Sequence, residues 1–180
     1  YNTAGTAAGV RLGTSDLATD TNVKLSSGGG EIRLVGQHVT SSVGSWGVIL
    51  RGGTTIDAGS GTISIDGKSD SNSGNAVGFE NNSTNKIKLL SSASSGTAIS
   101  VSGASTGTPA ALNGGRGIYF AVAGISINAS GGGDVSLVAS QANANNTNPG
   151  ALYSGGAGDI LASTGSVTLN GGTKGIYWTG

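Results

Sequence analysis

A glycine-rich corner followed by an apolar–polar–apolar triplet recurs five times along the chain. The five copies are GGGEIRL (28–34), GSGTISI (59–65), SGTAISV (95–101), GGGDVSL (131–137) and STGSVTL (163–169). Their first apolar residues are Ile32, Ile63, Ile99, Val135 and Val167, which lie 31, 36, 36 and 32 residues apart by subtraction. A repeat of this length favours an architecture that stacks one structural unit per repeat.

Two further apolar triplets accompany each corner. One lies upstream and begins at Val23, Ile56, Ile87, Ile125 and Ile160; the other follows after a longer gap and begins at Val48, Val77, Ile118, Leu152 and Ile176. Val10 starts the same series. Such alternation is typical of short strands, and Gly, Ser, Asn and Thr fill the connections, as turns require. The chain is therefore predicted to be all-β.

A flat sheet of such short strands would leave long unprotected edges, whereas coiling the chain lets equivalent strands pair. We therefore predict a right-handed parallel β-helix, a solenoid of about five coils of roughly 31–36 residues with three short strands each. Residues 1–180 are expected to form a single β-helix segment cut from a longer repeat protein, because no polar cap is recognisable near Val10 or Trp178.

The alternation also predicts which side chains of the recurring triplet are buried. Outward positions are expected at Arg33, Ser64, Ser100, Ser136 and Thr168. Two inward ladders are expected, comprising Ile32, Leu34, Ile63, Ile65, Ile99, Val101, Val135, Leu137, Val167 and Leu169.

Composition and charge narrow the possible partners. Lys plus Arg equals Asp plus Glu, at 9 each, so no basic field is available to attract nucleic acid. The chain has no cysteine, which removes disulfides and thiolate metal sites, and no apolar run long enough for a membrane-spanning helix. We expect no cofactor.

The glycine-rich corners do not match a phosphate-binding loop, because each one leads into a strand rather than a helix. Two weak calcium motifs occur: GGAGDIL (155–161), with Asp159, and DSNSG (70–74), with Asp70. Both are more typical of turns, and the sequence leaves calcium open. Acidic residues do not cluster at the aligned corners and His38 is the only histidine, so we expect no enzymatic activity.

The third triplet carries a tyrosine at the same outward position in three coils. These residues are Tyr119, Tyr153 and Tyr177, and the earlier coils have Arg11, Ile49 and Gly78 there. Tyrosine offers rigid amphipathic contact area, so this stripe is a candidate surface for binding glycans or a neighbouring filament. Asn113, Asn145 and Asn146, in the two longest loops, are further candidates.

The stretches GGGDVSLVAS, GSVTLNGGT and GISINAS resemble the haemagglutinin-type β-helical repeats of large bacterial surface exoproteins, the filamentous adhesins of the two-partner secretion family. The resemblance covers about Val10 to Trp178. It implies a secreted structural and adhesive stalk at the bacterial cell surface, with host or neighbouring cells, glycans or like chains as partners. Two alternatives remain open, namely a fibre subunit of a matrix or sheath and a polysaccharide-active β-helix enzyme.

Overall fold

The protein is represented by a computed structural model that describes residues 8–13, 22–39, 45–70, 74–80, 86–107, 115–121, 124–142, 150–156 and 158–179. Within these ranges, parallel strands form three sheets of six, five and five strands. A single turn of 3-10 helix, η1, spans Gly172–Lys174. No helix in the described part is long and apolar enough to cross a membrane.

The three sheets each take one strand from every coil. Sheet A contains β1 (Ala8–Leu12), β4 (Trp46–Arg51), β7 (Val77–Glu80), β10 (Ile118–Phe120), β13 (Leu152–Ser154) and β16 (Ile176–Trp178). Sheet B contains β2 (Lys24–Ser26), β5 (Thr55–Asp57), β8 (Ile87–Ser91), β11 (Ile125–Ala129) and β14 (Gly158–Ala162). Sheet C contains β3 (Ile32–His38), β6 (Ile63–Ser69), β9 (Thr97–Ser105), β12 (Asp134–Gln141) and β15 (Val167–Asn170).

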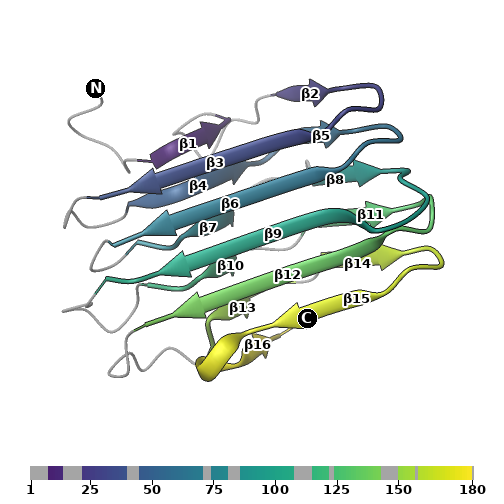
Figure 1. The fold of residues 1–180 in the computed structure, drawn as a ribbon. Helices are drawn as coiled ribbons and strands as arrows, with labels where there is room; N and C mark the ends of the chain where they lie inside the picture. The colour runs from purple at the N-terminus through teal and green to yellow at the C-terminus, as the bar shows by residue number, and fades with distance from the viewer. Residues whose placement is uncertain are drawn as a thin grey trace.

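The sheets wind into a parallel β-helix. Sheet C forms the front layer in Figure 1, and sheets A and B lie behind it. The front strands run from right to left and the chain returns behind them while it descends, so the coil is right-handed (Figure 1). Strands β2 to β16 make five successive sets of three. The predicted fold class is confirmed.

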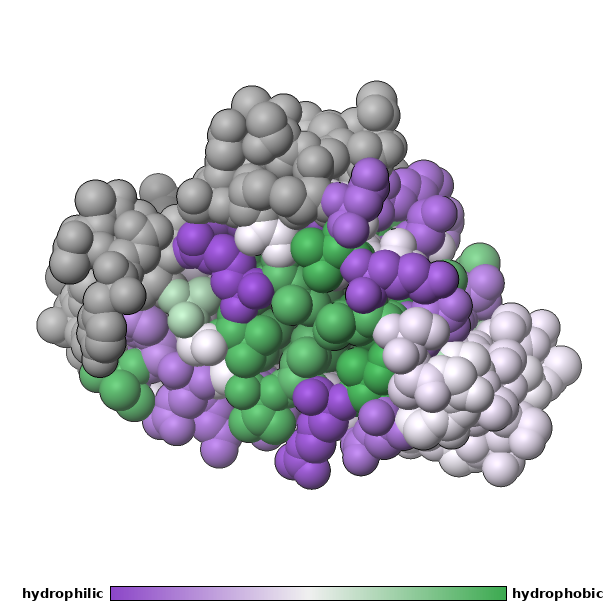
Figure 2. Space-filling model, turned by 90° about the horizontal axis from the view of Figure 1, so that it is seen from above, coloured by the Kyte–Doolittle hydropathy of each residue, from purple (hydrophilic) through white to green (hydrophobic). Residues whose placement is uncertain are grey.

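The inward ladders of sheet C have the predicted register. Ile63 pairs with Ile32 and Ile99, and Ile65 pairs with Leu34 and Val101. The same two ladders continue through β12 to β15. They are completely or almost completely buried in the middle coils, whereas Val167 and Leu169 in β15 are exposed. Figure 2, which looks down the axis from the end at which β1 lies, shows hydrophobic side chains inside the cross-section and hydrophilic side chains around them.

Two of the upstream triplets are placed differently from the prediction. When the upstream triplets of successive coils are aligned by their first residues, Ile56 and Ile160 are predicted to occupy the same position as Ile87. In the structure Ile56 pairs with Leu89, and Ile160 pairs with Ile127, so both triplets are shifted by two residues. A shift of two residues keeps every side chain on the same face, so the alternating pattern alone cannot detect it.

A column of glycines lets sheet C approach sheet A closely. Gly36, Gly67 and Gly103 are in register at an inward position of β3, β6 and β9. A Cβ atom at Gly103 would lie 2.0 Å from the carbonyl oxygen of Gly117, which directly precedes β10. Since a backbone atom cannot move aside as a side chain can, any larger residue must push the two sheets apart.

Gly103→Val is expected to destabilise the fold by about 3 kcal/mol, at the upper end of the range for overpacking, because its side chain collides with backbone. The midpoint of urea unfolding, followed by far-ultraviolet circular dichroism, measures the effect. Ala104→Val, at the next and outward-facing position of β9, is the control and should change stability by no more than about 0.5 kcal/mol. Equal effects of the two substitutions would contradict the close approach.

Candidate contact surface on sheet A

The tyrosine stripe, defined as Tyr119, Tyr153 and Tyr177, lies in register on the outer face of sheet A. Tyr119 pairs with Tyr153, and Tyr153 pairs with Tyr177. The column continues in register through Gly78 to Ile49 and Arg11, as the sequence predicts, but Ile49 is 0% exposed, so the predicted outward position in β4 is covered. Parallel pairing repeats the same outward direction on each strand, so three separate sequence segments present one continuous row of rings.

The rings of the stripe stack on one another along the solenoid axis. The centroids of Tyr153 and Tyr177 are 5.1 Å apart with the ring planes at 14°. Those of Tyr119 and Tyr153 are 5.6 Å apart and tilted by 43°. These contacts occupy the ring faces that point along the axis, so a ligand would meet mainly ring edges and hydroxyl groups. Tyr177 is 38% exposed, and the other two rings are partly buried.

Trp46, at the start of β4, extends the row of rings past β7, which has Gly78 in place of an aromatic residue at this position of the column. Its ring stacks on Tyr119 with a centroid separation of 6.2 Å and an interplanar angle of 20°. Gly78 lies between them in the column, and a Cβ atom there would lie 2.0 Å from the indole carbon Cζ3. Glycine at position 78 is therefore what leaves room for the indole.

Arg116 lies beside the gap between two tyrosine rings. Its guanidinium carbon is 4.5 Å from the ring centroid of Tyr119 and 4.2 Å from that of Tyr153, within the range of cation–π attraction. Its backbone amide donates a hydrogen bond to Oδ1 of Asn75 at 3.0 Å. This bond holds the backbone two residues before β10 begins. The cation thus lies where the two rings are tilted apart.

Burial shifts the pKa values of Arg116 and Tyr119. Desolvation lowers the pKa of Arg116 from its usual value, and the neighbouring Tyr119 and Tyr153 rings oppose that change. Desolvation raises the pKa of Tyr119, and the charge of Arg116 opposes the rise. Tyr119 therefore holds its phenolic proton more firmly than a free tyrosine.

A buried ion pair joins Arg51 and Glu80, the last residues of β4 and β7. Nη2 of Arg51 is 2.7 Å from Oε2 of Glu80, and the two side chains are only 6% and 16% exposed. Among the residues that the structure describes, the buried atoms Nε and Nη1 of Arg51 have no hydrogen-bond partner. Burial lowers the pKa of Arg51 and raises that of Glu80, while their mutual attraction opposes both changes.

The remaining predicted contact residues, Asn113, Asn145 and Asn146, lie outside the described residues. Sequence reasoning did not identify Trp46, Arg116 or the ion pair. Trp46 and Arg116 directly precede a glycine that comes before the apolar triplet, so the alternating pattern does not include them. Arg51 and Glu80 each follow the first apolar residue of their triplet by three positions, a signal that aligned triplets could have provided.

The only histidine of the chain is brought next to a serine, which the sequence did not predict. His38 and Ser69 are the last residues of β3 and β6, and they pair in register at a buried position. Ser69 is 1% exposed and His38 is 9% exposed. A serine nucleophile must reach its substrate, and this buried position gives it no surface from which to do so.

Three of the acidic residues have clear structural surroundings. The carboxylate of Asp134 accepts a hydrogen bond from the amide of Ser166 at 2.7 Å, and that of Asp57 accepts one from Gly59 at 3.0 Å. Both bonds order the turns between sheets B and C. Asp159 lies 4.0 Å from Nζ of Lys86 in an exposed pair. Among the described residues, no three His, Cys, Asp or Glu side chains are grouped as metal ligands, and Asp70 adjoins residues 71–73, outside the described part.

No protein-family model, curated protein or solved structure matches this chain.

Proposed function

We propose that this chain is a structural and adhesive segment of a secreted filament at the bacterial cell surface. The observation that carries the proposal is the in-register pairing of all three sheets along one axis. Each coil is hydrogen-bonded to the next in three ladders, and a buried apolar core runs through them. Such an assembly resists bending and extends in steps of about 4.8 Å per coil, as a stalk requires.

The tyrosine stripe supports the adhesive part of the proposal. It is a row of aromatic rings on the outer face of sheet A, with the guanidinium of Arg116 against two of them. Tyr, Trp and Arg are the residues enriched where proteins bind their partners. Glycans, the surfaces of host or neighbouring cells and like chains in a filament are the partners that we propose for this surface. The near-zero net charge of the chain argues for contacts of this kind over electrostatic capture of nucleic acid.

Beads coated with the chain are expected to attach to cells and glycan-coated surfaces more than uncoated beads do. The triple variant Tyr119→Ser, Tyr153→Ser, Tyr177→Ser should lose at least about tenfold in attachment, because the row of rings is removed. Far-ultraviolet circular dichroism checks that the variant remains folded. Ser64→Ala, Ser100→Ala and Ser136→Ala together, on the outer face of sheet C, provide the matched control. If coated beads attached no better than bare beads, the proposed adhesive function would be wrong. If the tyrosine variant attached as well as the natural chain, the tyrosine stripe would not be the adhesive surface.

A further inference from the structure

Tyrosine and tryptophan are the most easily oxidised side chains of this chain. Cysteine and methionine, which oxidants attack first in most proteins, are both absent. The described part of the chain contains three of its four tyrosines, and all three belong to the stripe. Within the described part, tyrosine oxidation is therefore confined to the outer face of sheet A.

Tyr153 and Tyr177 have the geometry of a pair that can couple. Their rings are stacked at 5.1 Å and 14°, and the β13–β16 pairing holds the two residues directly opposite each other. Both side chains lie outside the core, one partly buried and one exposed, so small rotations of the rings about their side-chain bonds are allowed. Holding two reacting groups together in this way replaces an encounter between molecules with an intramolecular step.

The neighbouring pair, Tyr119 and Tyr153, is less suited to coupling. Its rings are farther apart and tilted by 43°, and the guanidinium of Arg116 lies against both of them. Tyr119 also retains its phenolic proton more firmly, because desolvation raises its pKa. The row of three rings thus contains one favoured pair.

From this arrangement we propose that Tyr153 and Tyr177 are an oxidative cross-linking site, at which a dityrosine bond joins two successive coils. The proposal does not depend on the function proposed above. The oxidant is hydrogen peroxide acting through a peroxidase.

The reaction balances in two stages. Each phenol gives one electron and its hydroxyl proton to the oxidant, and one hydrogen peroxide accepts two electrons and two protons to become two waters. The two phenoxyl radicals then join through their Cε carbons, each adjacent to the carbon that bears oxygen. The hydrogens on those carbons move to the oxygens through water as the rings regain aromaticity. The product has lost two hydrogen atoms in total.

The cross-link would compensate for a feature of this chain. No cysteine is present, so no disulfide joins one coil to the next. A covalent bond between residues 153 and 177 closes a short loop and reduces the freedom of the unfolded chain, as a disulfide would. We therefore expect the oxidised chain to melt at a higher temperature than the untreated chain.

The experiment treats the dilute, purified 180-residue chain with peroxidase and hydrogen peroxide. Blue dityrosine fluorescence should rise, and the intact monomer should lose the mass of two hydrogens. Trypsin, which cleaves after Arg116 and Lys174, places Tyr153 in peptide 117–174 and Tyr177 in peptide 175–180, so the predicted bond joins these two peptides.

Matched single substitutions identify the pair. Tyr153→Phe and Tyr177→Phe should each reduce the intramolecular product to background, whereas Tyr119→Phe and Tyr1→Phe should retain it. Trp178→Phe should also retain it, because this exposed indole is an alternative target for the oxidant. Unfolding the chain in urea before oxidation should remove the selectivity for this pair.

Three results would overturn the proposal. They are a cross-link found only in dimers, a bond between Tyr119 and Tyr153 in place of the predicted one, and oxidation of Trp178 without any dityrosine. Failure of bead attachment would leave this outcome unaffected, so the two proposals can fail separately.

Discussion

Arg51→Met is expected to destabilise the folded chain by about 3–5 kcal/mol, the usual cost of removing one partner from a buried ion pair. The reason is that the Glu80 carboxyl group, only 16% exposed, would stay buried without the guanidinium that lies 2.7 Å from it, so its ionised form would have no charge partner and its neutral form would lose the ion pair. Glu80→Met should have a comparable effect, because it leaves Arg51 buried beside the positive charge of Arg11. The free energy of unfolding in urea measures both changes.

The double variant Arg51→Met, Glu80→Met should recover most of the loss, since removing both charges also removes the cost of burying them. The exposed pair Lys86–Asp159, at 4.0 Å, provides the control. Lys86→Met should change stability by no more than about 1 kcal/mol, as for most surface pairs. If the double variant were as unstable as the sum of the two single variants, the charges would not act as a pair.

The pair also predicts a direction for the pH dependence. Burial raises the pKa of Glu80 in the folded state, so the folded chain binds this proton more tightly than the unfolded chain does. The contribution of Glu80 to stability is then fully present below its unfolded pKa and is lost as the pH rises through the raised folded value. Relative to Glu80→Gln, the natural chain should gain stability on acidification. A relative loss would show that attraction to Arg51 outweighs desolvation.

The overall fold could be predicted because one signal repeats in every coil. Ile63, Ile99 and Val135 follow glycine-rich corners at similar intervals, and pairing them in parallel buries all of them together. Period-two alternation then assigns the face of each neighbouring side chain. The column that contains Tyr119, Tyr153 and Tyr177 follows from the same reasoning, because residues in register share a direction.

The sequence could not predict two features, the exact register of some strands and the side-chain contacts between distant coils. The positions of Ile56 and Ile160 were predicted two residues away from their true partners, because a shift of two leaves the buried face unchanged. The contact of Trp46 with Tyr119 passes over Gly78 and spans two coils, a relation that no local pattern encodes. Side-chain reach, rather than strand periodicity, determines that part of the surface.

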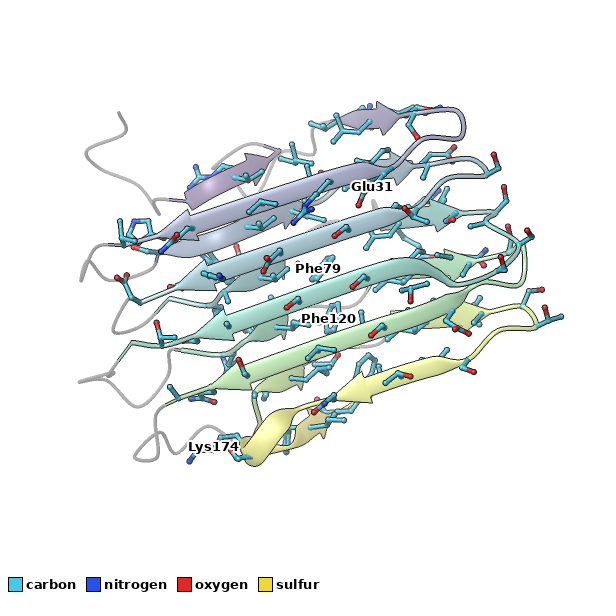
Figure 3. The ribbon with its side chains drawn as sticks, in the orientation of Figure 1. Glu31, Phe79, Phe120 and Lys174 are labelled. Atoms are coloured by element: carbon cyan, nitrogen blue, oxygen red, sulfur yellow. The ribbon has the colours of Figure 1, made fainter. Side chains whose placement is uncertain are left out.

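Phe120→Ala is expected to destabilise the chain by about 3–5 kcal/mol, the range for removing a buried aromatic side chain. Phe120 is 2% exposed and stacks on Phe79 with ring centroids 4.7 Å apart. The two residues pair directly between β7 and β10, and both lie inside the solenoid behind sheet C (Figure 3). Truncation would leave a cavity that the hydrogen-bonded coils on either side cannot close, so the full cost of the lost contacts should appear.

The free energy of unfolding in urea is measured for Phe120→Ala, Phe79→Ala and the double variant. These values give the total loss of stability and the part of it that is due to stacking of the two rings. A coupling of about 0.5–1.5 kcal/mol is expected between the two rings, as for other aromatic pairs in contact. Phe120→Leu serves as the control, since it keeps most of the apolar volume and should cost clearly less than the alanine substitution. If Phe120→Ala cost less than about 1 kcal/mol, the coils would have to collapse around the missing ring. The parallel ladders would then not be the rigid framework on which a row of stacked side chains depends.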